Sequence, residues 1–201
     1  RSSGLVYVSQ RQSRKDGIPV SLGDSVTVNG CNCHGGDASS GVALALDAPA
    51  NFPGGETYPL IITMESDVAT DGENQGGFFL STTQGSLAST DDSTQLIDGY
   101  MTHTVAGNDQ RSWNVNWSAP ADDTRIADFT LYGNSVNGNG APDTDGSDQW
   151  NRATFAVPGA NAMVGPEEIS DSRKVFYLRL VVIGTLGAVV VGNRMVSKGQ
   201  A

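Results

Sequence analysis

The sequence predicts an all-β fold, an antiparallel immunoglobulin-like β-sandwich, followed by a single C-terminal transmembrane helix. Two observations predict the sandwich. Apolar residues alternate with polar or small residues in short runs, and Gly, Pro, Asn and Asp separate these runs. One long apolar stretch near the C-terminal end predicts the transmembrane helix. The composition agrees with this fold, because 25 of the 201 residues are Gly and only 17% are charged.

Six runs carry the strand pattern, at residues 42–46, 58–64, 77–81, 113–117, 126–132 and 154–157. In the fourth run, Trp113 and Trp117 alternate with Asn114 and Asn116, which predicts one aromatic face and one polar face. Short strands at this spacing, with frequent turn residues between them, favour an antiparallel sandwich. We expect no long helix in this region.

The patterning divides the chain into five segments. We expect an N-terminal arm or edge strand at residues 1–24, the β-sandwich domain at 25–158, a linker at 159–172, the transmembrane helix at 173–193 and a short basic tail at 194–201. The stretch 175–191 is apolar apart from Arg179 and a few small or hydroxyl residues, and it lies at the short end of the lengths that span a membrane. A buried core helix or strand is the alternative for this stretch.

Charge is distributed unevenly along the chain. All 22 acidic residues lie at or before Asp171, together with seven of the 12 Lys and Arg, so this part has a net charge of −15. Such an acidic domain would be repelled by nucleic acid, which excludes it as a partner. The charge suits a basic partner or metal cations, and it is also explained by solubility alone. Basic residues flank both ends of the expected transmembrane helix, so the positive-inside rule does not determine its orientation in the membrane. The acidity of the domain favours a single-pass membrane protein with its globular domain on the extracytoplasmic side.

The most informative residues are Cys31, Cys33 and His34, which lie within a Gly-rich block at 30–36. Two thiols beside an imidazole could attach haem c through two thioethers, with His34 as an axial ligand of the iron. They could instead bind copper or zinc, with a fourth ligand from elsewhere. The two cysteines could also form a strained disulfide with each other.

A second axial ligand for haem iron would come from His103, the only other histidine in the chain. Met101 is the competing candidate, because methionine also ligates haem iron in cytochromes. The two residues are two positions apart, so on a strand their side chains would face the same side.

A weaker signal is the acidic turn that contains Asp143, Asp145 and Asp148, which could hold calcium. A solvated acidic turn without a metal explains the same pattern. No nucleophile elbow, catalytic triad or phosphate-binding glycine loop is visible, so we do not expect an enzyme that acts alone.

Several blocks of the sequence together resemble a known family. They are Gly30–Gly36, Pro53–Leu60, Gly77–Leu80, Tyr100–Thr104, Ser112–Pro120 and Tyr132–Gly140. In this order they resemble the Reeler-like, or choice-of-anchor V, domains of secreted and surface-anchored microbial proteins. The resemblance implies an extracytoplasmic β-sandwich with a C-terminal anchor. Many microbial members look as if they carry the haem-attachment pattern C-x-x-C-H, where this chain has C-x-C-H.

These observations favour a membrane-anchored, extracytoplasmic monohaem c-type cytochrome that carries single electrons. Its expected partners are redox proteins or other subunits of a membrane complex. One alternative is a non-catalytic accessory ectodomain of such a complex. Another is a copper- or zinc-binding module that uses Cys31, Cys33 and His34.

Overall fold

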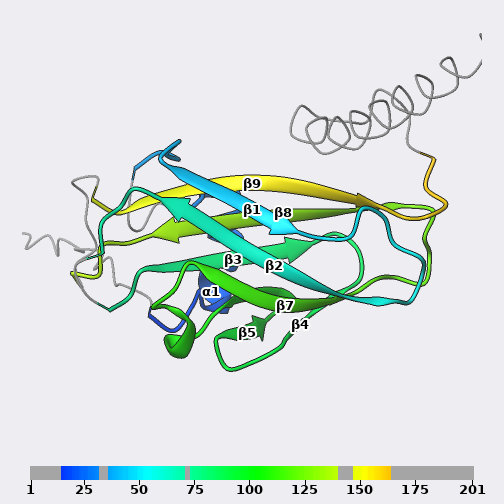
Figure 1. The fold of residues 1–201 in the computed structure, drawn as a ribbon, viewed down its shortest axis with the longest axis horizontal. Helices are drawn as coiled ribbons and strands as arrows, with labels where there is room; N and C mark the ends of the chain where they lie inside the picture. Colours follow the sequence, from blue (N-terminus) through cyan, green and yellow to red (C-terminus); the bar gives the residue numbers. More distant parts are fainter. Residues whose placement is uncertain (1–14, 32–35, 71–72, 140–146, 164–201) are drawn as a thin grey trace, which may run out of the picture. The chain divides into compact units, whose positions relative to one another are not determined.

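The computed structural model describes residues 15–31, 36–70, 73–139 and 147–163 (Figure 1). The chain divides into two compact units, Arg1–Ala162 and Met163–Ala201, and the fold below is that of the first. Its described part contains helix α1 (Val20–Asn29), a short 3₁₀ helix η1 (Val105–Gly107) and nine strands. The strands are β1 (Val42–Asp47), β2 (Thr57–Ser66), β3 (Gly76–Thr82), β4 (Ser86–Ser89), β5 (Thr94–Ile97), β6 (Tyr100–His103), β7 (Ser112–Ser118), β8 (Ile126–Ser135) and β9 (Gln149–Pro158).

The strands form two sheets. The first has the order β1-β2-β7-β4 and the second has the order β5-β6-β3-β8-β9. Every pairing between these strands is antiparallel. The predicted all-β, antiparallel sandwich is therefore confirmed.

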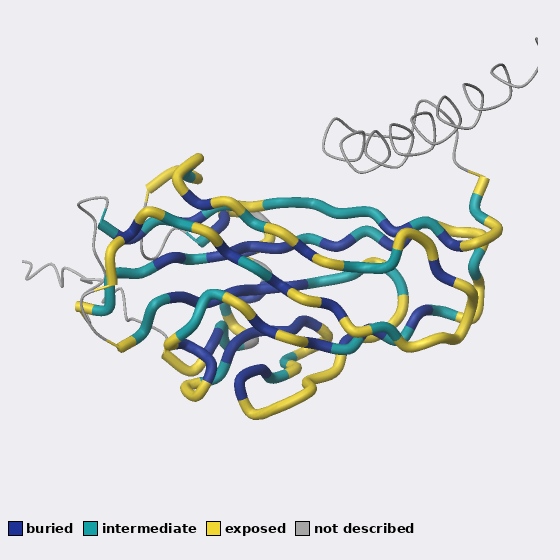
Figure 2. Tube along the Cα trace, viewed as in Figure 1, coloured by how far each residue is buried: buried dark blue, intermediate teal, exposed yellow. Residues whose placement is uncertain are grey.

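The main core lies between the two sheets, and β7 shows how the sequence builds it. Trp113, Val115 and Trp117 are at most 1% exposed, whereas Asn114 on the other face is exposed. Buried residues also alternate with more exposed ones along much of β2 and β8, whereas β6 and most of β3 are buried on both faces (Figure 2). Full burial of each large apolar side chain contributes roughly 1.5–3 kcal/mol, so this alternation fixes which face of each strand turns inward.

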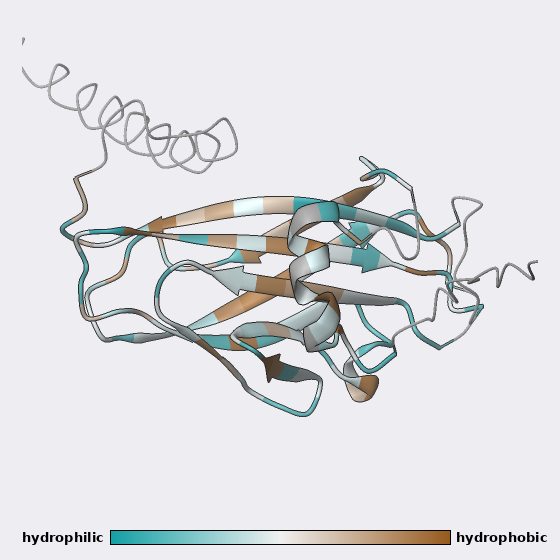
Figure 3. Cartoon of the chain, turned by 180° about the vertical axis from the view of Figure 1, so that it is seen from behind, coloured by the Kyte–Doolittle hydropathy of each residue, from teal (hydrophilic) through white to brown (hydrophobic). Residues whose placement is uncertain are grey.

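A second apolar layer covers the outer face of the five-stranded sheet. Phe79, Tyr100, Tyr132 and Trp150 form it, and helix α1 packs on top of them (Figure 3). The Tyr100 hydroxyl donates to the Ile18 carbonyl at 2.9 Å, and the Tyr132 hydroxyl donates to the Thr27 carbonyl at 3.1 Å. These two hydrogen bonds attach both ends of the helical segment to the sheet.

The sequence did not predict α1, and the expected boundary between arm and sandwich at residues 24 and 25 falls inside this helix. Val20, Val26, Thr27 and Val28 are β-branched, and Gly23 interrupts the segment, so its intrinsic helix propensity is low. No side chain caps its N-terminus. The helix therefore depends on its contacts with the aromatic layer.

The strands β8 and β9 pair along their whole length, and this pairing defines the two ends of the sandwich. At one end Ser135 pairs with Gln149, and Gly76 of β3 pairs with Ser135. At the other end Ile126 pairs with Pro158, and Gly159 forms a bridge with Phe52. The chain leaves the first unit at this second end, shortly after Ala162.

The expected linker, transmembrane helix and basic tail lie almost wholly outside the described residues. Among the residues that the structure does describe, no helix is long and apolar enough to cross a membrane.

Candidate functional site

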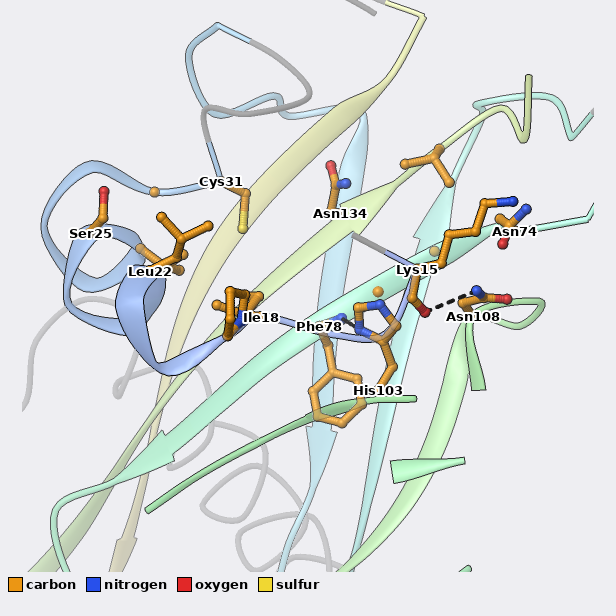
Figure 4. A pocket seen from close by; sticks show the side chains of 16 residues that line it. Lys15, Ile18, Leu22, Ser25, Cys31, Asn74, Phe78, His103, Asn108 and Asn134 are labelled. Carbon is orange, nitrogen blue, oxygen red and sulfur yellow. Dashed lines mark hydrogen bonds between the residues drawn. The ribbon is translucent and has the colours of Figure 1, made fainter. Parts of the chain in front are cut away.

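A pocket lies between α1 and the outer face of the five-stranded sheet (Figure 4). Ile18, Leu22 and Val26 line it from the helical side. Cys31, Gly77 and His103 also line it, and Cys31 and His103 bring a thiol and an imidazole to the pocket. Its volume is about 100 Å³ when measured by the positions that the centre of a water molecule can occupy. Cys31 and His103, which five strands separate in the sequence, therefore share one apolar pocket.

Cys31 enters the pocket because α1 ends immediately before it. Gly30 terminates the helix with φ of 74°, a left-handed conformation that favours glycine, and its N–H donates to the Val26 carbonyl at 2.9 Å. A side chain at residue 30 would also collide with the Trp150 ring. Cys31 is half-buried and packs against the aromatic layer.

His103 ends β6 and is 7% exposed. Its imidazole lies over Gly77, where a Cβ atom would collide with the ring. The Phe78 N–H donates to His103 Nδ1 at 3.3 Å, so the ring takes the place of a backbone carbonyl at the end of the strand pairing. His103 therefore has a structural role in addition to its position in the pocket.

The hydrogen bonds around His103 constrain its tautomer. Because the Phe78 N–H can only donate, Nδ1 accepts and a neutral ring carries its proton on Nε2. Binding a metal through Nε2 requires the opposite tautomer, with the proton on Nδ1. Thr102 Oγ1 lies 3.4 Å from Nδ1, and its own proton goes to the Phe78 carbonyl at 2.7 Å, which leaves a lone pair to accept from Nδ1.

Met101 lies elsewhere, contrary to the expectation that it faces the same side as His103. Met101 is 0% exposed and belongs to the core between the two sheets, where its sulfur lies 3.7 Å from Ser89 Oγ. The alternation breaks because His103 is the last residue of its strand and its ring turns over Gly77. Met101 would reach the pocket only if the sandwich core opened.

The structure describes only some of the other predicted site residues. Cys33, His34, Asp143 and Asp145 lie outside the described ranges. Asp148 is 3% exposed, and its Oδ1 accepts the Asn137 N–H at 3.0 Å. Asp148 therefore supports the chain locally, and the proposed calcium turn stays a prediction.

The arrangement of Cys31 and His103 limits what they could hold together. A single ion bound by both would need the sulfur and the nitrogen within about 4.4 Å of each other, from Zn–S and Zn–N bond lengths. In Figure 4, Cys31 lies beside α1 and His103 lies on the far side of Ile18, near Asn108. Among the described residues, no group of three His, Cys, Asp or Glu side chains is close enough to hold a metal ion.

The side chains at the pocket are suitable haem ligands, but the pocket is too small for a haem. A thiol for a thioether and an imidazole for the iron both border the pocket. Pockets for large organic ligands usually measure about 300–1,000 Å³, whereas this one measures about 100 Å³. A porphyrin therefore fits only if α1 moves outward from the sheet.

Sequence reasoning missed two residues next to Cys31. The first is Tyr132, whose pKa is raised, chiefly by burial. The Arg152 guanidinium, 5.5 Å from the centre of the Tyr132 ring, lowers this pKa, and Cys31 raises it further. Trp150 donates its indole N–H to the Gly36 carbonyl at 3.1 Å. In the sequence, Trp150 lies between the polar residues Gln149 and Asn151. A large aromatic residue in such a polar run could have indicated a buried contact.

Comparison with known proteins identifies no family. No protein-family model matches the chain, and no curated protein matches it. Among solved structures, the human F-spondin reeler domain is 14% identical, with a TM-score of 0.42 over 62% of this chain and 91% of that chain. Another structure of the Reelin-N domain of F-spondin is 14% identical, with a TM-score of 0.41 over 62% and 89%. A cohesin module of a Clostridium perfringens glycoside hydrolase is 11% identical, with a TM-score of 0.40 over 60% and 97%. Similarities this low say nothing about the pocket.

Proposed function

We propose that this chain is a membrane-anchored, extracytoplasmic monohaem c-type cytochrome that carries single electrons, and that its sandwich is a Reeler-like domain. One observation carries the proposal: Cys31 and His103 border the same apolar pocket although they are distant in sequence. An apolar pocket that joins a thiol and an imidazole is the environment that a covalently held haem needs.

Each residue has a distinct role in this proposal. Cys31 and Cys33 would hold the haem through thioethers, and His34 and His103 would be the ligands of its iron. The haem supplies the one-electron chemistry, and the chain binds it, orients it and keeps water away. Ile18 and Leu22 provide the apolar cover. Ligation through Nε2 would require the His103 proton to move to Nδ1, where Thr102 Oγ1, 3.4 Å away, could accept it in place of the present hydrogen bond from the Phe78 N–H.

The helix above the pocket is suited to move. Its sequence has low helix propensity, and its N-terminus lacks a side-chain cap. Two tyrosine hydroxyls and a small apolar contact hold it on the sheet. Displacing α1 to admit a porphyrin would break these two hydrogen bonds, each worth about 0.5–1.5 kcal/mol, and the apolar faces of the porphyrin would have to replace the contacts of α1 with the aromatic layer.

The location belongs to the same proposal. The apolar stretch at 175–191 serves as the anchor within a transmembrane helix at 173–193, and the domain with a charge of −15 lies on the extracytoplasmic side. Its partners are redox proteins or subunits of a membrane complex, and a basic contact surface on the partner suits this charge.

A second candidate is a copper- or zinc-binding module that uses Cys31, Cys33 and His34. The small pocket favours this reading, because an ion held at residues 31–34 would not require α1 to move. Elemental analysis separates the two: the module carries one copper or zinc per chain and shows no Soret band.

The deciding experiment is an absorption spectrum of the native protein, oxidised and reduced, with a pyridine haemochrome assay after acid-acetone extraction. We expect a Soret band and haem that stays on the polypeptide. His103→Ala should convert a low-spin spectrum to high-spin. Met101→Leu, a core change of similar volume, should leave it low-spin. A colourless native protein refutes the cytochrome, and a low-spin His103→Ala protein removes His103 as the ligand.

A further inference from the structure

A second hollow, which we call the β5 groove, lies between strand β5, the 3₁₀ helix η1 and the turn that precedes α1. Asp16 and Pro19 line it from the turn, Gln95 and Ile97 line it from β5, and Val105 lines it from η1. Its volume is about 480 Å³, measured in the same way as that of the pocket beneath α1. The two hollows share Pro19 and are otherwise lined by different residues.

Exposed aliphatic side chains border the β5 groove. Val105 is 61% exposed, and Leu96, which lies in β5 between Gln95 and Ile97, is 50% exposed. They are two of the four large hydrophobic residues that are exposed in the part of the chain that the structure describes. Single exposed hydrophobic residues are ordinary, but two beside one groove are typical of a contact surface.

Strand β5 also offers a backbone edge, because it is the outermost strand of its sheet. Asp98 and Gly99, both with positive φ, form the two-residue turn that joins it to β6. Such a turn makes the flanking residues Ile97 and Tyr100 a hydrogen-bonded pair. Since hydrogen-bonded and non-hydrogen-bonded pairs alternate, Leu96 directs its backbone N–H and C=O away from β6. An extended segment of a partner can add to an edge of this kind.

The charge of the groove selects the partner. Asp16 and Asp92 both line it and are exposed, and none of the described residues that line it is basic. The backbone carbonyls of these two residues accept hydrogen bonds from Gln95 and Thr104, so their carboxylates can pair with a partner without loss of these contacts. The net charge of −15 on the chain up to Asp171 repels an acidic partner and attracts a basic one.

We propose that the β5 groove binds an extended segment of a partner protein that carries aliphatic side chains beside lysine or arginine. The aliphatic side chains cover Val105 and Leu96, and the basic ones pair with Asp16 and Asp92. Gln95 donates to the His103 carbonyl at 3.0 Å, so the groove adjoins one of the proposed haem ligands. The use of this surface for electron transfer rests on the proposed function.

The test measures how the full chain binds a fluorescent seven-residue peptide of alternating lysine and valine, by fluorescence anisotropy. Asp16→Asn and Asp92→Asn should each weaken binding roughly two- to fivefold, as expected for the loss of one exposed ion pair. Asp47→Asn is the matched control, because it removes the same charge from an exposed position in β1 of the other sheet. It should leave the affinity unchanged, and a peptide of alternating glutamate and valine should not bind.

Equal weakening by Asp47→Asn and Asp92→Asn would show that the peptide follows net charge rather than the groove, and would overturn the proposal. NMR locates the site: the lysine peptide should shift the amide signals of residues 92–97 and 104–106. If these signals shift instead when the chain alone is diluted, a second copy occupies the groove and the proposal is wrong.

The docking surface and the cytochrome can fail separately. If the native protein is colourless but binds the lysine peptide selectively at these residues, the cytochrome proposal fails and the docking surface stands. If the native protein carries haem but binds the peptide no better than the Asp92→Asn variant does, the cytochrome stands and the docking surface is refuted.

Discussion

The contact between Gly77 and His103 gives the sharpest test of how the site is built. A methyl group at residue 77 would collide with the imidazole, and Gly77 has no positive φ, so alanine suits its backbone. Gly77→Ala must therefore displace the ring and remove the acceptor of the Phe78 N–H. Overpacking costs about 1–3 kcal/mol and an unsatisfied buried donor costs about 1–3 kcal/mol. We expect the unfolding free energy to fall by about 2–6 kcal/mol, the sum of the two contributions.

A double-mutant cycle assigns this loss to the imidazole. His103→Ala removes the ring, so Gly77→Ala in that background should cost almost nothing, or stabilise by about 0.4–1 kcal/mol through the unfolded state. The coupling energy between the two sites should then be at least about 2 kcal/mol. Urea denaturation followed by tryptophan fluorescence measures all four proteins. Gly36→Ala is the control, because its methyl would meet no atom within 4 Å. A coupling energy below about 0.5 kcal/mol refutes the reasoning.

Three further predictions concern the surroundings of the pocket. Gly23→Ala should destabilise the protein although alanine normally favours a helix by about 1 kcal/mol, because the new methyl would lie 2.8 Å from the Tyr100 ring; a raised urea midpoint would contradict this. Arg111→Leu should accelerate amide hydrogen exchange at Val68 and Gln75 and lower stability by about 1–3 kcal/mol, because the guanidinium donates to the carbonyls of Ser66, Val68 and Gln75. Burial raises the pKa of Tyr132, so its stabilising effect is present below about pH 10 and is lost as the pH rises through the raised pKa. Tyr132→Phe should therefore lose less stability than the unmodified chain between about pH 8 and about pH 11, and an equal loss in both proteins would exclude Tyr132 as the cause.

The sandwich could be predicted because several of its strands, such as β2 and β7, are buried on one face only. In β7 the sequence alternates strictly, and the tryptophans turn inward as the alternation requires. The four-residue strands β4 and β5 could not be predicted in the same way. Each is too short to show a period. Strand β4 forms on the edge that the longer β7 offers it, and β5 forms on the edge of β6, which is itself only four residues long.

Helix α1 could not be predicted from its own residues. Val26 and Val28 alternate with polar residues, which is a strand-like pattern, and glycine interrupts the segment. The segment is helical because Tyr100 and Tyr132, far along the chain, hold it on the sheet. Tertiary contacts here override the local preference, and a single sequence does not show them.

The candidate site could also be predicted only in part. The scarcity of histidine singled out His103, but the pocket it shares with Cys31 exists only because α1 crosses the sheet. Trp150 could not be predicted as a partner of Gly30 and Gly36, because both contacts depend on where β9 lies in the folded sheet.

Strand β9 separates the pocket region from the opposite end of the sandwich. Trp150, near the start of the strand, contacts Gly30 and Gly36, whereas the last residue, Pro158, pairs with Ile126. Ten residues of extended strand span about 30 Å. A reporter group attached near Pro158 would therefore follow the state of the sandwich from a position remote from the pocket.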